Sequence, residues 1–429
     1  MKKVLIITYY WPPSGGAGVQ RWLKFAKYLP EFGWQPIILT IDPQYASYPQ
    51  RDESLLSEVD PGCLVYTTQS FELYNLYKLI SGKKEVPYGG FANDAKEGIF
   101  QKLAKFLRGN FLLPDPRKGW NKYALKKAAE LIHKYNIKTV VTTSPPHSTQ
   151  LIGLKLKKQF NIQWIADLRD PWTDIYYYNQ FSHTALARWI DKRYERKVVE
   201  NADLLITVSE DVKRIFTEKS DLNIAAKTAV IPNGFDEDDF KIPSVPAERR
   251  KIITYTGTIS EAYDVGCLLK ALSSLDDRLK SVLLIRFVGK VPPSVEQKFR
   301  AAGLQLELVG YVDHPKSIEY LFRSDLLLLI LPKVKNNRGI LTGKFFEYLA
   351  SHKPILAIGP TDGDLAKIIQ ETQCGKLFDY DDTEGMFNYI QDQLVNPQVR
   401  TNPELANQYS RKELTRKIVQ LLETKQVNA

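Results

Sequence analysis

The stretch from Leu326 to Pro360 limits the possible folds of this chain most strongly. It contains an apolar run of strand length, a polar loop, a short amphipathic helix and a second apolar run, and reads LLLLILPKVKNNRGILTGKFFEYLASHKPILAIGP. This order predicts a βαβ unit, and the uninterrupted apolar runs indicate parallel strands buried on both faces. Ligands bind beyond the carboxyl ends of such strands, so we expect the loop 336–342 to border a binding site.

The helix expected over residues 343–351 has two distinct faces. Three apolar residues recur at helical spacing and should face the core, namely Phe345, Phe346 and Leu349. Lys344 and Glu347 share the opposite face. Lys344 would lie at the positive end of the helix, beside a loop that contains Arg338, and this arrangement indicates a clamp for a diphosphate. Glu347 can accept hydrogen bonds from vicinal hydroxyls. The alternative is an ordinary Lys–Glu pair on a solvated helix face.

The length and composition favour a soluble protein of two domains. The chain has 429 residues, of which 44% are hydrophobic and 25% are charged. Its three cysteines are far apart, which argues against a disulfide framework or a zinc site and favours a reducing compartment. No apolar run approaches the ~18 residues that span a bilayer. We interpret the N-terminal run as a strand rather than a signal peptide, and expect a cytoplasmic protein that can lie peripherally on the inner face of the membrane.

The basic charge is concentrated in the first half. Residues 1–230 contain 33 Lys and Arg against 23 Asp and Glu, which accounts for the whole net charge of +10. Residues 96–138 contain 11 of these cations and only three acids, interleaved with Phe, Leu and Trp side chains. This mixture predicts an interfacial helix on an anionic membrane. The alternative is a core-facing helix with a solvated basic side, and no nucleic-acid recognition motif is present.

Strand and helix signals alternate in two runs, so the predicted fold class is α/β with two facing, doubly wound Rossmann-like domains and a cleft between them. We place the first domain at residues 1–230 and the second at 235–405, after the turn Pro232-Asn233-Gly234, with the linker-like sequence KIPSVPAERR close behind. Residues 45–118 lack a βα rhythm and are interpreted as an insertion. A terminal helix at 408–425 is expected to complete the first domain.

Several candidate residues follow strands of the first domain. Gly15 and Gly16 let backbone approach a phosphate or sugar closely, although their spacing is not that of a dinucleotide fingerprint. His147 follows the strand expected over 138–143. A further set, Asp167, Arg169 and Asp170, ends the strand beginning at Gln163. For these three, acceptor contact and a purely structural role remain equal alternatives.

The segment GKFFEYLASHKPILAIGP, together with Pro232-Asn233-Gly234, resembles the family 4 retaining glycosyltransferases of GT-B fold. The resemblance makes Glu347 the second Glu of a Glu-x7-Glu motif, which holds the nucleotide ribose. The first Glu is replaced by Gly339, so the chain resembles the branch that lacks it and has Lys344 near the diphosphate. Gly257 is followed by Thr258 where the family has Arg, and we infer that Lys344 and Arg338 compensate.

The resemblance implies a hexosyltransferase that transfers a sugar from a nucleotide-diphosphate donor to an acceptor hydroxyl with retention, in cell-envelope polysaccharide or glycolipid synthesis. It implies no divalent metal and no cofactor, since the nucleotide sugar is a substrate. Its partners would be that donor, a glycan or lipid-linked acceptor and an anionic membrane surface, with no nucleic acid.

The residues expected to act fall into three groups. The catalytic set is His147, Lys344, Arg338 and Asp170, the donor-binding set is Gly15, Gly16, Gly257, Gly289, Glu347, Thr342 and Gly343, and the acceptor-side set is Asp167 and Arg169. Three alternatives remain open: a catalytically silent sugar-nucleotide-binding protein, a sugar-nucleotide epimerase on the same fold, and an NAD-linked enzyme using Asp42 at the end of the second strand.

Overall fold

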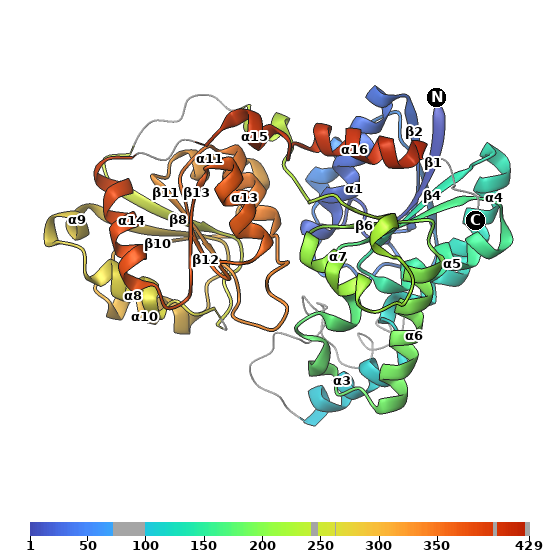
Figure 1. The fold of residues 1–429 in the computed structure, drawn as a ribbon, viewed down its shortest axis with the longest axis horizontal. Coiled ribbons are helices and arrows are strands. Elements are labelled where there is room, and N and C mark those ends of the chain that lie inside the picture. The colour runs from blue at the N-terminus through green and yellow to red at the C-terminus, as the bar shows by residue number, and fades with distance from the viewer. Residues whose placement is uncertain (72–98, 242–247, 262, 398–400, 425–429) are drawn as a thin grey trace. The chain divides into compact units, whose positions relative to one another are not determined.

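The computed structural model describes residues 1–71, 99–241, 248–261, 263–397 and 401–424. They form two compact units, one of Met1–Ile231 with Leu414–Ala429 and one of Pro232–Glu413. Each unit has its own parallel sheet with helices on both faces (Figure 1). The α/β, doubly wound fold class predicted from the sequence is therefore confirmed. No helix among the described residues is both long enough and apolar enough to span a membrane.

The first unit is built on a parallel sheet of order β3-β2-β1-β4-β5-β6-β7. Its strands are β1 (Lys2–Ile7), β2 (Trp34–Ile41), β3 (Leu64–Thr68), β4 (Thr139–Ser144), β5 (Gln163–Leu168), β6 (Leu204–Thr207) and β7 (Thr228–Val230). The strand order reverses at β1, which lies between β2 and β4. Such a reversal is where open α/β sheets bind ligands, beyond the carboxyl ends of the strands.

Helices cover both faces of this sheet because its strands are apolar on both sides. In β1, Val4 and Ile6 pack beneath α1 (Ala17–Tyr28), whereas Leu5 and Ile7 pack beneath α4 (Asn121–Tyr135) and α5 (Gln150–Gln159). Alternate side chains of a strand point to opposite faces, so a continuous apolar run requires two covering layers. The remaining helices are α3 (Ile99–Phe111), α6 (Ala185–Asn201) and α7 (Glu210–Thr217).

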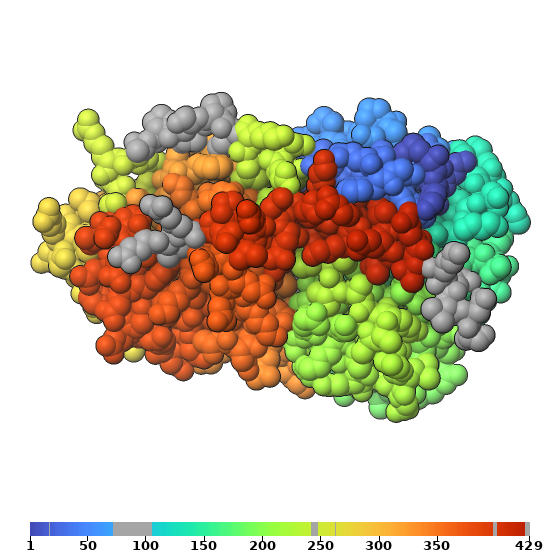
Figure 2. All heavy atoms as spheres, turned by 45° about the horizontal axis from the view of Figure 1, so that its top comes forward, coloured from blue at the N-terminus to red at the C-terminus, as the bar shows by residue number. Residues whose placement is uncertain are grey.

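The terminal helix α16 (Arg411–Glu423) belongs largely to this first unit, from Leu414 onward. Leu414, Ile418 and Leu422 recur at helical spacing and are buried in the same cluster as Val4. Figure 2 shows the helix lying along the surface against the N-terminal residues. The Gln163 side chain also donates hydrogen bonds to backbone carbonyls at the end of this helix.

The region 45–118, predicted to be an insertion, contributes β3 to the sheet instead. Residues 64–68 pair in parallel with β2, with Leu64 opposite Ile37. No residue of this edge strand is fully buried, so it lacks the apolar run that marks the other strands. A short half-exposed strand gives no clear periodic signal, which explains the wrong interpretation. The rest of this region includes residues 72–98, which lie outside the described residues.

The second unit repeats the arrangement with a parallel sheet of order β10-β9-β8-β11-β12-β13. Its strands are β8 (Lys251–Thr256), β9 (Leu283–Val288), β10 (Leu306–Gly310), β11 (Leu326–Ile330), β12 (Ile355–Ile358) and β13 (Gly375–Phe378). The strand order reverses between β8 and β11. The predicted βαβ unit of residues 326–360 is confirmed as β11, α12 (Gly343–Ala350) and β12.

Two core layers hold the helices of the second unit. Helices α8 (Gly266–Ser273), α10 (Pro293–Ala301) and α14 (Thr383–Val395) pack on one face of the sheet. The other face is covered by α11 (His314–Phe322), α12, α13 (Asp364–Thr372) and α15 (Pro403–Asn407). A short helix α9 (Asp277–Val282) precedes β9. Of the predicted linker KIPSVPAERR, residues 242–247 lie outside the described residues.

A buried ion pair joins α1 to the carboxyl end of β5 in the first unit. The guanidinium of Arg21 contacts the carboxylate of Asp167 at 3.0 Å, and both side chains are fully buried. Asp167 also accepts hydrogen bonds from the Trp22 indole N–H and the Thr143 hydroxyl. Because five donated hydrogen bonds, three of them from Arg21, offset the desolvation of the carboxylate, this pair can persist in the core.

Replacing Arg21 with Met should lower the free energy of unfolding by about 3–5 kcal/mol, because Asp167 would then be a buried, unpaired charge. Urea unfolding followed by circular dichroism measures the change. The double variant Arg21→Met/Asp167→Leu should recover part of the loss. A single variant as stable as the wild type would contradict this role.

Candidate functional site

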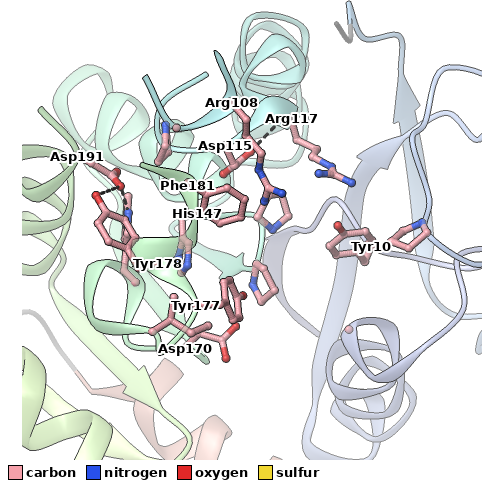
Figure 3. Close-up of a pocket in the computed structure, with 18 of the residues that line it drawn as sticks. Tyr10, Arg108, Asp115, Arg117, His147, Asp170, Tyr177, Tyr178, Phe181 and Asp191 are labelled. Atoms are coloured by element: carbon pink, nitrogen blue, oxygen red, sulfur yellow. Dashed lines mark hydrogen bonds between the residues drawn. The ribbon is translucent and has the colours of Figure 1, made fainter. Parts of the chain in front are cut away.

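A cavity of about 310 Å³ lies at the carboxyl ends of β1, β4 and β5, at the strand reversal of the first unit. Figure 3 shows labelled lining side chains from the loops after these strands, from α3 and α6, and from the segment between α3 and α4. The predicted residues Gly15, Gly16, His147 and Asp170 all line it. Aromatic rings form much of its wall, contributed by Tyr10, Trp172, Tyr177, Tyr178 and Phe181.

His147 begins a short 3-10 turn directly after β4, where the sequence placed it. Its ring stacks on the indole of Trp172, with centroids 4.6 Å apart and planes 14° apart. Burial, aided by the charges of Lys219 and Arg169, lowers the pKa of His147 to about 3. The imidazole is therefore neutral near pH 7. Its Nδ1 is buried and has no hydrogen-bond partner among the described residues.

A carboxylate on α6 fixes the aromatic wall. Asp191 accepts hydrogen bonds from the Trp172 indole N–H at 3.0 Å and the Tyr178 hydroxyl at 2.9 Å. Burial raises the pKa of Asp191 to about 7, although these two hydrogen bonds oppose the shift. The His183 ring stacks on Tyr178 with centroids 4.1 Å apart. Asp191 therefore orients the two rings on which the histidines of the cavity stack.

A second carboxylate holds the loop that carries His147. Asp115 accepts hydrogen bonds from the Ser148 backbone N–H at 2.7 Å and the Ser148 hydroxyl at 2.8 Å, and it also caps the turn at Arg117. Asp170 enters the cavity from the end of β5. Its pKa is raised by burial, and the charge of Arg169 opposes that shift. These contacts make Asp115 a positioning residue, whereas the carboxylate of Asp170 borders the cavity directly.

The structure gives Asp167 a fully buried position, whereas Arg169 is half-buried and its contact with an acceptor stays a prediction. The Asp167 carboxylate is fully buried among Arg21, Trp22 and Thr143, so it cannot reach an acceptor. Arg169 donates hydrogen bonds to the carbonyls of Ser144 at 2.7 Å and Gly18 at 3.0 Å. It thus ties the end of β4 to the first turn of α1. The acceptor-contact interpretation is wrong for Asp167.

The glycine loop after β1 is shaped by backbone constraints. Gly16, which precedes α1, has φ of 86°, a left-handed value that suits glycine. The Gly15 backbone N–H donates a hydrogen bond to the Gln50 carbonyl at 3.0 Å.

Asp42, considered as a ribose ligand for an NAD-linked enzyme, accepts hydrogen bonds from the backbone and side chain of Gln44 and thus closes a local turn.

A second group of predicted residues gathers in the other unit, where β8 ends and α12 begins. The ammonium of Lys344 donates a hydrogen bond to the Tyr255 hydroxyl at 2.8 Å and lies 4.1 Å from the centre of that ring. It also lies beside Gly257, where an added Cβ would be 3.2 Å from Nζ. Burial lowers the pKa of Lys344 to about 8, with the charge of Glu347 opposing. A cation held this way favours an incoming anion.

The remaining α12 residues form part of the same group. Glu347 lies 3.2 Å from the His314 Nε2. Thr342 precedes Gly343, the first residue of α12, but its side chain does not cap the helix. Its hydroxyl is buried and has no hydrogen-bond partner among the described residues. The helix therefore presents a cation, a hydroxyl and the positive end of its dipole at one terminus.

Two predicted residues have other contacts. Gly289 packs against Gly257, because an added Cβ would lie only 2.2 Å from the Gly257 carbonyl oxygen. Its small size permits the close approach of the two loops. Arg338 forms an ion pair with Asp362 at 2.6 Å, and both side chains are more than half exposed. No contact joins Arg338 to Lys344 among the described residues, so the structure does not bring Arg338 into the Lys344 group.

The sequence reasoning missed several residues that line the cavity. Three of them are Trp172, Tyr178 and Asp191, none of which was among the predicted site residues. A usable signal was present in the aromatic run that follows Arg169-Asp170, which reads PWTDIYYYNQFSH.

Among the described residues, no group of three or more His, Cys, Asp or Glu side chains is arranged to hold a metal ion.

Comparisons with known proteins agree with this architecture. Residues 91–239 match the sequence profile of Glycosyltransferase Family 4. No curated protein matches the chain by sequence. Among solved structures, a sucrose-phosphate synthase from Thermosynechococcus elongatus matches with a TM-score of 0.62 and 17% identity over 98% of both chains.

Two further solved structures extend this likeness. Anabaena HepE in complex with UDP and glucose matches with a TM-score of 0.62 and 14% identity over 99% of this chain and 100% of that one. The lipopolysaccharide outer core galactosyltransferase WaaB matches with a TM-score of 0.58 and 11% identity over 98% and 99% of the respective chains. At these identities the likeness shows the fold alone, which is GT-B.

The buried position of His147 predicts that its imidazole does not titrate near neutral pH. In histidine-selective NMR, with a His147→Gln variant to assign the signals, its ring resonances should stay unchanged between about pH 5 and pH 8 because burial disfavours the imidazolium. A titration midpoint near 6.5 for His147 would contradict the described environment.

Proposed function

We propose that the protein is a glycosyltransferase that moves a sugar from a nucleotide-diphosphate donor to an acceptor hydroxyl with retention of the anomeric configuration. The observation that carries this proposal is the Lys344 group, in which a half-buried ammonium lies beside Gly257 at the start of a helix. The match of residues 91–239 to Glycosyltransferase Family 4 and the GT-B fold support it independently.

The donor would bind to the second unit. The Lys344 ammonium and the N-terminus of α12 would neutralise the diphosphate, which becomes more negative as the sugar leaves. Glu347 would accept hydrogen bonds from the ribose hydroxyls, held in place by His314. The Thr342 hydroxyl offers a further donor at the same terminus. Because Gly339 and Thr258 replace charged residues of the resembling family, Lys344 carries more of the charge stabilisation here.

The acceptor would bind in the cavity of the first unit. Aromatic rings suit the apolar faces of a sugar, and the neutral His147 can hydrogen-bond an uncharged hydroxyl. The departing phosphate oxygen would then take the acceptor proton on the same face of the sugar, so the step needs no histidine base. Asp170, Gly15 and Gly16 border the space in which the transferred sugar would lie. We infer no cofactor for this reaction.

The biological setting is the finer part of the proposal. We infer a role in cell-envelope polysaccharide or glycolipid synthesis, with a glycan or lipid-linked acceptor and peripheral association with the inner face of the membrane. The basic excess of residues 1–230 supports the membrane association. Two alternatives keep the same donor site: a catalytically silent binding protein, favoured by Gly339 and Thr258, and a sugar-nucleotide epimerase, which would act without an acceptor.

Substitution of Lys344 tests the donor site directly. Lys344→Ala should weaken UDP binding, measured by isothermal titration calorimetry, by roughly 10- to 100-fold, because one charge-assisted hydrogen bond is lost. Turnover should fall by ~10²-fold. Glu347→Ala should also weaken binding. Lys335→Ala, which removes an exposed cation from the preceding loop, is the matched control. Full affinity and turnover in both site variants would refute the assignment.

The pH dependence of UDP binding provides a second test. The diphosphate requires the charged form of Lys344, whose pKa is about 8 in the free protein. Affinity should therefore fall as the pH rises through about 8, and binding near that pH should take up a proton. Calorimetry in buffers of different ionisation enthalpy measures this uptake. Lys344→Ala should lose most of the uptake, and equal uptake by this variant and the wild type would contradict the role.

A further inference from the structure

Five large apolar side chains are exposed on two helices of the first unit. Phe106, Leu107 and Phe111 lie on α3, and Phe111 is 73% exposed. Leu186 and Trp189 lie on the first turns of α6 and are 66% and 57% exposed. Exposed aromatic and leucine side chains in such number indicate an interaction site.

Specific hydrogen bonds hold these two helices together. The Asn110 side chain on α3 accepts a hydrogen bond from the Thr184 backbone N–H at 2.7 Å and donates one to the Ser182 carbonyl at 3.2 Å. The Arg108 guanidinium lies over the Phe181 ring, 4.0 Å from its centre. Figure 1 shows α3 beside the start of α6. The apolar side chains of both helices therefore belong to one surface.

Cations border these apolar side chains. Arg188, Lys192 and Arg193 on α6 are exposed and form no ion pair with any described carboxylate. Residues 99–111 contain no acid at all. In the first three turns of α6 the only acid is Asp191, which is buried. We call the three cations and five apolar residues the α3–α6 surface: Phe106, Leu107, Phe111, Leu186, Arg188, Trp189, Lys192 and Arg193.

The structure relocates the interfacial cations that the sequence assigned to residues 96–138. Lys105 is only 6% exposed, and Trp120 is fully buried with its indole N–H bonded to Thr68. Neither can contact a membrane. Lys96 lies outside the described residues, and the side chain of Lys102 is not described either. Exposed cations remain in this segment at Lys118, Lys122, Lys126, Lys134 and Lys138. The cations that border the exposed apolar side chains of α3 and α6 include Arg188, Lys192 and Arg193 of α6, which tertiary packing brings beside α3.

We propose that the α3–α6 surface docks on an anionic lipid bilayer. Its apolar side chains would enter the boundary between headgroups and acyl chains, while the three cations contact lipid phosphates. Trp189 suits this boundary because indole has an apolar body and a polar N–H. The absence of exposed acids from this part of α3 and α6 makes the surface complementary to anionic headgroups.

This surface shares a helix with the candidate acceptor cavity. Arg108 and Gly109 line the cavity, while their neighbours Phe106, Leu107 and Phe111 face outward. A docked protein would therefore hold the cavity close to the headgroups. If the cavity binds the acceptor, which rests on the proposed function, that acceptor is the glycan headgroup of a membrane lipid.

Trp189 gives the docking a specific signal. The other six tryptophans of the chain are all buried, so an aqueous quencher such as acrylamide reaches mainly Trp189. Vesicles of phosphatidylcholine with phosphatidylglycerol should shield this fluorescence, and lipids brominated near the headgroup should quench it. Vesicles of phosphatidylcholine alone should have little effect at low salt.

Charge and apolar contacts can be removed separately, with partition to the same vesicles measured by flotation. Arg188→Glu/Arg193→Glu should weaken partition by about 10- to 100-fold. Leu186→Ser/Phe111→Ser should weaken it by at least about 10-fold. Two variants serve as matched controls: Lys138→Glu/Lys158→Glu and Leu222→Ser. They alter exposed residues near the amino ends of β4, β5 and β7. Both should bind the vesicles like the wild type.

UDP binding separates this proposal from the proposed function, because it is measured without lipid. All of these variants should bind UDP with wild-type affinity. Equal partition to neutral and anionic vesicles, or equal losses in the control and surface variants, would overturn the docking surface. Either result would leave the donor site intact. Conversely, lipid docking without binding of either UDP or GDP would refute the transferase assignment alone.

Discussion

The ion pair between Arg21 and Asp167 fixes the part of the first unit on which the candidate cavity depends. It joins the first helix to the carboxyl end of β5, and the Thr143 hydroxyl extends the contact to β4. Two residues later, Arg169 binds the carbonyls of Ser144 and Gly18. Because these buried charges hold three strand-end loops together, His147 and Asp170 can project into one cavity from separate strands. Their positions therefore depend on residues outside the lining of the cavity.

The two candidate sites rely on burial in different ways. In the first unit, burial keeps His147 neutral and raises the pKa of Asp191, so the cavity presents hydrogen-bonding groups with reduced charge. This suits an uncharged sugar. In the second unit, burial beside Tyr255 lowers the pKa of Lys344, which makes the free protein favour an anionic ligand. Under the proposed function, the same desolvation would suit one site to the hydroxyl groups of the acceptor and the other to the diphosphate of the donor.

Much of the fold could be predicted because most strands carry uninterrupted apolar runs. The run Leu326–Leu331 and the helix of Phe345 and Phe346 show this clearly, whereas β3 was missed because its side chains are only partly buried. The positions of His147 after β4 and of Lys344 at the start of α12 could also be predicted. Trp172 and Asp191 could not, because their place in the cavity depends on tertiary contacts between a turn and α6. For the same reason the burial of Lys105 was not foreseen.

Transfer chemistry is tested most directly by proton NMR of a nucleotide-sugar panel incubated with the protein and a membrane lipid extract. UDP-glucose, UDP-galactose, UDP-N-acetylglucosamine and GDP-mannose would form the panel, because the anomeric proton reports both bond cleavage and configuration. The account predicts that one donor releases its nucleoside diphosphate while the sugar appears in a lipid product with the configuration of the donor. An inverted product, or a donor that is epimerised without an acceptor, would contradict it.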